Sequence, residues 1–92
     1  MTTVYDIIRF MESIAPQSKK ESWDNVGLLC GRRDKQVTTI LVALDPFEDV
    51  AEEAVKLGAD LIMTHHPLIF HPLYSLTDDT AIGRTAATLL RH

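Results

Sequence analysis

The middle of the chain limits the possible folds most, because its pattern changes from strand to helix and back to strand. Residues 37–44 are rich in β-branched and apolar side chains, which predicts a strand buried on both faces. Asp45 and Pro46 favour a helix start, since an aspartate caps free amides and a proline tolerates the first helical position. Gly58 is typical of a helix end, and residues 60–64 predict a further strand. This order is typical of a βαβ unit with parallel strands and a right-handed crossover.

Two further helices are expected, one near each end of the chain. Residues 3–14 carry apolar side chains at steps of three and four, which predicts an amphipathic helix. Thr3 and Asp6 resemble a capping box at its start, and Pro16 prevents its continuation. Residues 80–91 predict the final helix, although several threonines weaken its pattern.

An apolar run at residues 26–30 predicts one more strand. Gly31 and the charged residues 32–35 follow it and favour a turn, so this strand is expected to pair antiparallel with residues 37–44. The expected fold is therefore α/β, with a mixed sheet, an N-terminal helix, a β-hairpin and a right-handed βαβ unit. No repeat, linker or change in composition divides the chain, so residues 1–92 are expected to form a single α/β unit.

Composition narrows the function classes. The 92 residues are 46% hydrophobic and 24% charged, which is ordinary for a globular domain and excludes a disordered or fibrous chain. No apolar run approaches the roughly 18–20 residues that a membrane span needs, and no secretory signal is visible. The single cysteine, Cys30, cannot form an internal disulfide, so a reducing compartment such as the cytoplasm is expected. A net charge of −4 without a basic stripe argues against binding to nucleic acid.

The segment that begins with His65, His66 and Pro67 is the strongest candidate for a functional site. Ligands collect at the carboxyl ends of parallel strands, and both histidines lie where the strand 60–64 ends. Neighbouring residues of a regular strand point to opposite faces, but Pro67 ends the ladder and lets both rings face one cavity. Neutral imidazole is a common ligand of zinc and similar divalent ions. These residues predict a metal site, while the simpler alternative is one hydrogen-bonded and one exposed imidazole.

Two imidazoles are fewer than the roughly three protein ligands typical of a catalytic zinc site. Asp45 is the candidate third group, because it ends the neighbouring parallel strand and lies at the same edge. Its alternative role is to cap the following helix, and a carboxylate that already accepts amide hydrogen bonds is a poor metal ligand. His71 is expected to be a solvated side chain, and His92 a frayed terminal residue.

The stretch from Trp23 to Gly27 is the second unusual feature. Trp23 is expected to pack over the loop as an anchor, and Asp24 and Asn25 suit a turn into the next strand. The functional alternative for these residues is a polar lip beside the histidine cavity. Cys30 is expected to act as a small buried hydrophobe. Glycine-rich phosphate loops and the HExxH and GxSxG motifs are absent, so nothing supports a serine or cysteine nucleophile.

Three motifs in a fixed order carry a resemblance to a known family. They are ESWDNVGL at residues 21–28, LVALD at residues 41–45 and HHPLIF at residues 65–70. Together with the amphipathic first helix, they resemble the Nif-three-like family, whose members are often called GTP cyclohydrolase I type 2 homologues or dinuclear-metal-centre proteins. The similarity extends over nearly all 92 residues, and Pro46 departs from the aliphatic residue that is more usual in the family.

This resemblance implies a dinuclear metal site in an α/β domain, with His65 and His66 as two of its ligands. The cofactors would be divalent metal ions (zinc, manganese or iron), two per site in the full-length protein. The family's remaining ligands lie in later segments, so the resemblance implies that this chain is the N-terminal part of a longer metal-binding protein with a larger Nif-three-like fold. Members commonly form homo-oligomeric rings, which implies self-association.

Two functions of different class follow. The first is a metal-dependent hydrolase, similar to GTP cyclohydrolase I type 2, that acts on a nucleotide-like small molecule when full length, while this chain alone is expected to be inactive. The alternative is a non-catalytic metal-binding or protein-interaction module with a regulatory role. A general acid or base beside the metals distinguishes the two, and Asp45 is the one candidate that the chain offers.

Overall fold

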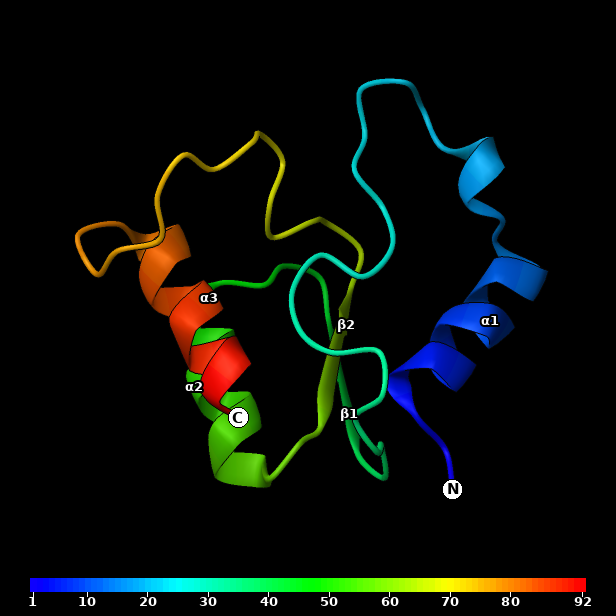
Figure 1. Ribbon diagram of the computed structural model, residues 1–92, viewed down its shortest axis with the longest axis horizontal. Coiled ribbons are helices and arrows are strands. Elements are labelled where there is room, and N and C mark those ends of the chain that lie inside the picture. Colours follow the sequence, from blue (N-terminus) through cyan, green and yellow to red (C-terminus); the bar gives the residue numbers. More distant parts are fainter.

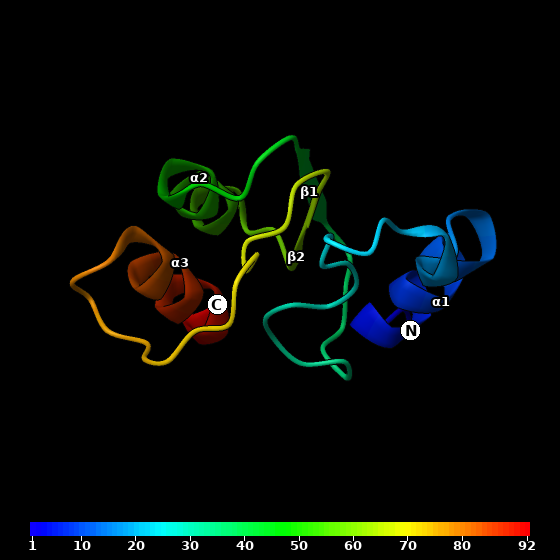
Figure 2. The same cartoon turned by 90° about the horizontal axis from the view of Figure 1, so that it is seen from above.

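The computed structural model describes residues 1–92 and places a two-stranded sheet between helices (Figure 1). Helices α2 and α3 lie on one side of the sheet and α1 lies on the other, as the view from above also shows (Figure 2). In chain order the elements are α1 (Val4–Ile14), a short 3₁₀-helix (Gln17–Lys19), β1 (Ile40–Ala43), α2 (Glu48–Leu57), β2 (Leu61–Thr64) and α3 (Ala81–Arg91). None of these helices has the length and apolarity needed to cross a membrane.

Helix α1 begins where the sequence predicts it. The Thr3 hydroxyl accepts a hydrogen bond from the Asp6 backbone N–H at 3.3 Å, and the Asp6 carboxylate accepts one from the Thr3 N–H at 2.9 Å. The expected capping box is therefore confirmed. The N–H of Val4 donates to the carbonyl of Lys35 at 2.9 Å, which joins the start of α1 to the segment before β1.

Strands β1 and β2 pair in parallel with α2 between them, which confirms the parallel strand–helix–strand unit. The register places Ile40 opposite Leu61 and Ala43 opposite Thr64. Helix α2 ends at Gly58, whose φ of 69° lies in the left-handed region that glycine adopts without strain. The α/β class predicted from the sequence is thus correct.

The predicted strand at residues 26–30, and the hairpin that depended on it, are wrong. This segment forms no strand, and the sheet is a parallel pair rather than a mixed sheet. Gly27 near the start of the segment and Gly31 directly after it have φ values of 105° and 118°, which an extended strand does not contain. The apolar run therefore turns at both ends and remains a loop.

Strand β1 is shorter than predicted and is not buried on both faces. It begins at residue 40 rather than residue 37, and Val42 is 72% exposed. The backbone N–H groups of Thr38 and Thr39 donate to the Asp60 carboxylate at 2.9 and 3.2 Å. Because these two amides bind a side chain, they are not available for the strand ladder, and the ladder starts after them.

Helix α3 packs against α2 and confirms the predicted C-terminal helix. The Thr80 hydroxyl caps it by accepting a hydrogen bond from the Gly83 N–H at 3.0 Å. A Cβ at Gly83 would lie 1.9 Å from the Thr77 carbonyl oxygen, so the chain needs a glycine here. Arg84 donates to the Glu48 carboxylate at 3.0 Å, which joins the two helices and raises the pKa of Arg84.

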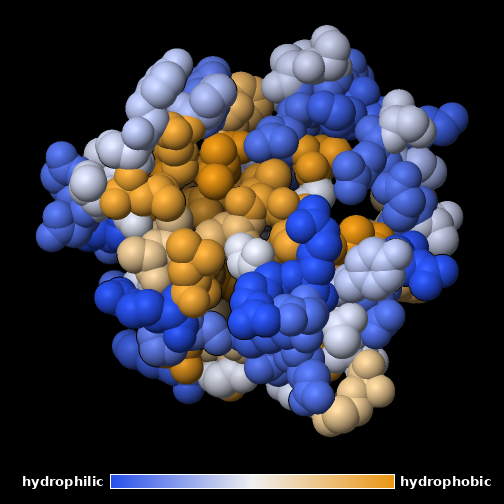
Figure 3. All heavy atoms as spheres, viewed as in Figure 1, coloured by the Kyte–Doolittle hydropathy of each residue, from blue (hydrophilic) through white to orange (hydrophobic).

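Burial is uneven across the sheet. Seven of the 92 residues are buried, and most of them belong to α2 and α3. Between α1 and the end of α3, an open hollow of about 1180 Å³ is lined by these two helices, β2 and residues 24–31. Apolar side chains gather in the middle of the face shown in Figure 3, between polar margins. The hollow therefore has largely apolar surroundings and lies beside the carboxyl end of β2.

Candidate metal-binding site

His65 and His66 directly follow β2, and the sheet's hydrogen bonds continue through them. The N–H of His65 donates to the Ala43 carbonyl at 3.3 Å, and the N–H of His66 donates to the Leu44 carbonyl at 3.0 Å. The two imidazole rings lie side by side, with centroids 4.9 Å apart and an interplanar angle of 62°. Both residues are exposed and line the hollow, so the structure brings together the two histidines that the sequence singled out.

Asp45 does not cap α2, so its predicted capping role is wrong. The N-cap of α2 is Phe47, which has an extended backbone and makes no side-chain capping bond. Because Pro46 and Phe47 separate Asp45 from the first helical residue, its carboxylate reaches the neighbouring strand end instead of the helix amides. Its Oδ1 atom lies 2.7 Å from Nδ1 of His66. Asp45 therefore lies at the same sheet edge as the histidines, as expected.

Further polar contacts fix the chain after β2. The Thr64 hydroxyl donates to the His66 carbonyl at 2.6 Å. The Asn25 side-chain amide donates to the Ile69 carbonyl at 2.6 Å, which ties residues 24–27 to the segment after the histidines. Because these partners are 44 positions apart in the sequence, no local signal could have shown this bond. Asn25 thus lies beside the hollow, as the polar-lip alternative predicts, but it does not lead into a strand.

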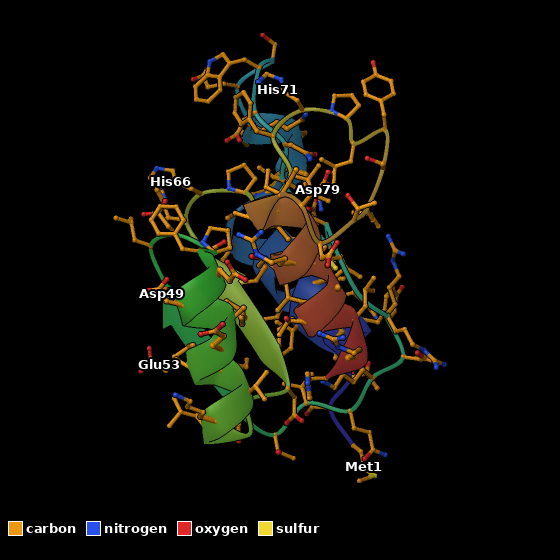
Figure 4. All side chains as sticks on the ribbon, turned by 90° about the vertical axis from the view of Figure 1, so that its left-hand side faces the viewer. Met1, Asp49, Glu53, His66, His71 and Asp79 are labelled. Atoms are coloured by element: carbon orange, nitrogen blue, oxygen red, sulfur yellow. The ribbon has the colours of Figure 1, made fainter.

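Trp23 packs at the outer end of this region. Its ring centroid lies 6.2 Å from that of Phe70, and the residue is 65% exposed. His71 packs against the other side of the segment, with its ring 4.9 Å from Phe70 and nearly perpendicular to it. Figure 4 shows His71 well separated from His66. Trp23 contacts Phe70 but remains mostly exposed, so it is not the packed anchor that the sequence predicted, whereas His71 is exposed as expected.

Cys30 and His92 take no part in the histidine pair. The Cys30 thiol is half-buried and lies 3.8 Å from the Ala86 carbonyl. Burial raises the pKa of this thiol, which disfavours the reactive thiolate and agrees with a packing role. His92 is exposed and lies outside α3, and Lys35 donates a hydrogen bond to its backbone oxygen at 2.6 Å.

The family model described as Duf34/NIF3 (NGG1p interacting factor 3) matches residues 2–92. This chain belongs to the NIF3 family. The match confirms the resemblance that three motifs and the first helix indicated. The fold of this NIF3-family chain can therefore be compared with that of other family members.

Curated relatives of the NIF3-family chain carry the name GTP cyclohydrolase 1 type 2 homolog. The relative from Clostridium perfringens is 49% identical over 87 residues, which cover 95% of this chain and 33% of that protein. The relative from Halalkalibacterium halodurans is 42% identical over 86 residues, which cover 94% of this chain and 23% of that protein, so the chain spans a third or less of the length of both relatives. It therefore corresponds to one part of those proteins.

Solved structures of NIF3-family proteins share the fold. A Staphylococcus aureus protein of known crystal structure superposes with a TM-score of 0.93 at 40% identity, covering 99% of this chain and 29% of that one. A Bacillus cereus protein related to NIF3 superposes with a TM-score of 0.88 at 39% identity, covering 96% of this chain and 24% of that one. The arrangement of α1, the βαβ unit and α3 is thus that of the matching part of NIF3 proteins.

The side chains of the NIF3-family chain fit part of a divalent-ion site. The Asp45 carboxylate is hydrogen-bonded to Nδ1 of His66, so Nε2 is the ring nitrogen without a partner. Neutral imidazole nitrogens suit zinc and other borderline ions. No group of three or more histidine, cysteine, aspartate or glutamate side chains in the chain is arranged to hold an ion. The chain therefore offers two imidazole donors rather than a complete ligand set.

Proposed function

We propose that this chain supplies His65 and His66 as two ligands of a dinuclear divalent-metal site in a metal-dependent hydrolase. The supporting observation is the pair of exposed imidazoles, 4.9 Å apart, at the carboxyl end of a parallel strand pair. Strand ends of this kind are where open α/β sheets bind their ligands. Two ions about 3.5–4 Å apart can each take a separate imidazole.

The hydrolytic chemistry would come from the bound ions, which lower the pKa of a coordinated water and polarise a ring carbon or phosphoryl oxygen. The chain's own residues would hold and orient these ions. His65 and His66 donate ring nitrogens, and the backbone bonds to Ala43 and Leu44 fix the start of both side chains. The adjoining hollow of about 1180 Å³ has room for a nucleotide-sized molecule. The relatives' name, GTP cyclohydrolase 1 type 2 homolog, supports a nucleotide-like substrate.

We expect the other ligands to lie beyond residue 92. Zinc, manganese and iron are the candidate ions, because each accepts imidazole nitrogen. We also propose that the full-length protein associates with itself, as the family resemblance implies. The ligands that this chain lacks make weak binding the expected behaviour of the isolated 92 residues.

A second function, a non-catalytic metal-binding or regulatory module, rests on the surroundings of the histidines. Asp45 is the one carboxylate that contacts the pair, and it already faces Nδ1 of His66. The chain thus provides no free general acid or base beside the imidazoles. Metal binding without turnover in the full-length protein is the outcome that would favour this second function.

Calorimetric titration of the full-length protein with zinc and manganese tests the metal site. Wild-type protein should bind about two ions per chain, and the double variant His65→Ala/His66→Ala should lose this stoichiometric binding. His71→Ala is the matched control, since it removes an exposed imidazole that lies apart from the pair. Tight binding that survives in the double variant would overturn the proposal.

The metal-loaded protein is then screened for hydrolysis of nucleotides, with the double histidine variant beside it. We expect turnover in the wild type and a loss of at least about 100-fold in the variant, because the ligands of the reactive ion are removed. Equal rates in both proteins would show that the hydrolysis comes from a contaminant or from another site.

A further inference from the structure

We infer that Asp45 is a positioning residue, which holds His66 in one tautomer and orientation so that Nε2 is the nitrogen offered to a metal ion. This inference rests on the proposed metal site. It starts from the 2.7 Å separation between Oδ1 of Asp45 and Nδ1 of His66. The two residues are 21 positions apart in the sequence, so the fold and not local geometry brings them together.

The strand register explains why these two residues meet. Ala43 lies opposite Thr64 at the ends of β1 and β2, and Asp45 and His66 each follow two residues later. The ladder continues past the strands through the bond from the His66 N–H to the Leu44 carbonyl at 3.0 Å. The Thr64 hydroxyl also holds the His66 carbonyl. The backbone of His66 is therefore fixed on both sides before its ring meets the carboxylate.

The chemistry of the two groups sets the direction of the hydrogen bond. A carboxylate only accepts, so the 2.7 Å contact requires the hydrogen to be on Nδ1 of His66. In a neutral ring the Nε2 atom then carries the free lone pair, which is what a metal ion needs. Carboxylates that accept from a ligating histidine fix its ring and raise its basicity as a ligand.

Asp45 has no competing task in the structure. Helix α2 takes Phe47 as its N-cap, and no backbone amide donates to the Asp45 carboxylate. The Asp45 side chain is 29% exposed and that of His66 is 55% exposed, so the carboxylate lies deeper than the imidazole it contacts. This arrangement is expected of a carboxylate that holds one edge of a metal-ligating imidazole ring while the opposite edge of the ring stays accessible.

His65 provides an internal comparison. Its ring lies 4.9 Å from that of His66, yet it makes no side-chain hydrogen bond. The two neighbouring imidazoles are thus unequal: the structure fixes the tautomer of His66 and leaves that of His65 free. The inference predicts a matching inequality in their nitrogen spectra.

Long-range ¹H–¹⁵N NMR of the metal-free full-length protein tests the tautomer directly, at about pH 8, where free imidazole is neutral. We expect His66 to carry its proton on Nδ1 and His65 to show the Nε2-protonated form that free histidine prefers. In Asp45→Ala the proton of His66 should move to Nε2. A wild-type spectrum with His66 protonated on Nε2 would overturn the inference.

Competitive zinc titration supplies the second readout. Asp45→Ala should weaken zinc binding about 10–100-fold, and Asp45→Asn, which keeps an acceptor oxygen without the charge, should lose less. Asp49→Ala is the matched control, because it removes an exposed carboxylate from the first turn of α2, where Asp49 accepts only from the Val50 N–H (Figure 4). Unchanged zinc affinity in both Asp45 variants would contradict the positioning role.

The two proposals fail in different ways. A wild-type protein that binds no zinc, manganese or iron overturns the proposed function and the ligand role of His66 with it. A metal-binding protein whose Asp45 variants keep both tautomer and affinity overturns the positioning role alone. Asp45→Asn guards against loss of folding, since it preserves the size of the side chain.

Discussion

The two sides of the sheet differ in how tightly they are packed. On the side of α2 and α3, small buried residues such as Ala51 and Ala86 let the two helices lie directly against each other. Toward α1 the packing is open, and α1, residues 24–31, β2 and the end of α3 surround the hollow of about 1180 Å³. The packed side thus fixes the geometry of the βαβ unit, while the open side leaves space beside His65 and His66.

The largest expected effect comes from adding volume on the packed side. Gly83→Ala should lower the free energy of unfolding by about 3 kcal/mol, because the new Cβ would overlap the Thr77 carbonyl. Urea unfolding measures the loss. Gly31→Ala on the open side is the comparison: a Cβ there meets nothing within 4 Å, so only backbone strain of about 1–2 kcal/mol is expected at its φ of 118°. Equal losses of unfolding free energy in the two variants would show that the two regions do not differ in how tightly they are packed at these glycines.

The second effect concerns the tie that holds the open side to the segment after β2. Asn25→Ala removes the donor to the Ile69 carbonyl and should cost about 1 kcal/mol. We expect faster protease cleavage within residues 20–36, because this loop loses its bond to the rest of the chain. Asn25→Asp keeps the shape and replaces the donor by an acceptor, so it should cleave at least as fast. A loop as resistant as the wild type in both variants would show that other contacts hold it.

A third prediction uses pH to test the junction between the βαβ unit and the loop before it. The amides of Thr38 and Thr39 donate to Asp60 and hold the pKa of its carboxyl below the ordinary 3.8. A lowered native pKa means that this stabilisation is present above the unfolded-state pKa of about 3.9 and is lost as pH falls through the native value.

Urea midpoints of the wild type and Asp60→Asn, compared from neutral pH down to about pH 2.5, measure this contribution. Asp6 and Asp34 also have lowered pKa values, but they titrate in both proteins, so the difference isolates Asp60. The difference between the two proteins should shrink at acid pH. A constant difference would show that the Asp60 charge has no part in holding Thr38 and Thr39.

The smallest effect is expected on the exposed face of β1. Val42→Thr conserves size and shape, and at 72% exposure it should change the unfolding free energy of the 92-residue chain by less than about 0.5 kcal/mol. Thermal or urea unfolding measures it. A loss above about 1.5 kcal/mol would show that this face is covered in solution, and would narrow the contrast between the two sides of the sheet.

Local signals made much of the fold predictable. The capping box of Thr3 and Asp6 and the left-handed Gly58 depend on interactions between neighbours in the sequence, and the strand–helix–strand order between residues 37 and 64 indicated the parallel unit. Family membership likewise followed from short motifs. Signals of this kind can be recognised in a single sequence.

The failures have two physical causes, which are backbone turns at glycines and partners far away in the sequence. The apolar run at residues 26–30 has the composition of a strand, but it pairs with neither strand of the sheet. Gly27 and Gly31, with positive φ values, bend its backbone out of the extended conformation. Asp45 has the position of a helix cap, yet the end of β2 offers it an imidazole. Composition and spacing describe what a residue can do, and only the fold decides which partner it meets.

The parallel register places Asp45 at the strand end that carries two adjacent histidines, and its carboxylate contacts the ring of His66. Because successive residues of a strand alternate in direction, a one-residue slip between β1 and β2 would present His65 to the carboxylate and exchange the roles of the two rings. The length of α2 has no such influence, since a whole extra helical turn leaves both strand ends in place. Relatives that conserve the role of each histidine should therefore tolerate insertions in the helix, and should keep a fixed number of residues from Asp60 to His66.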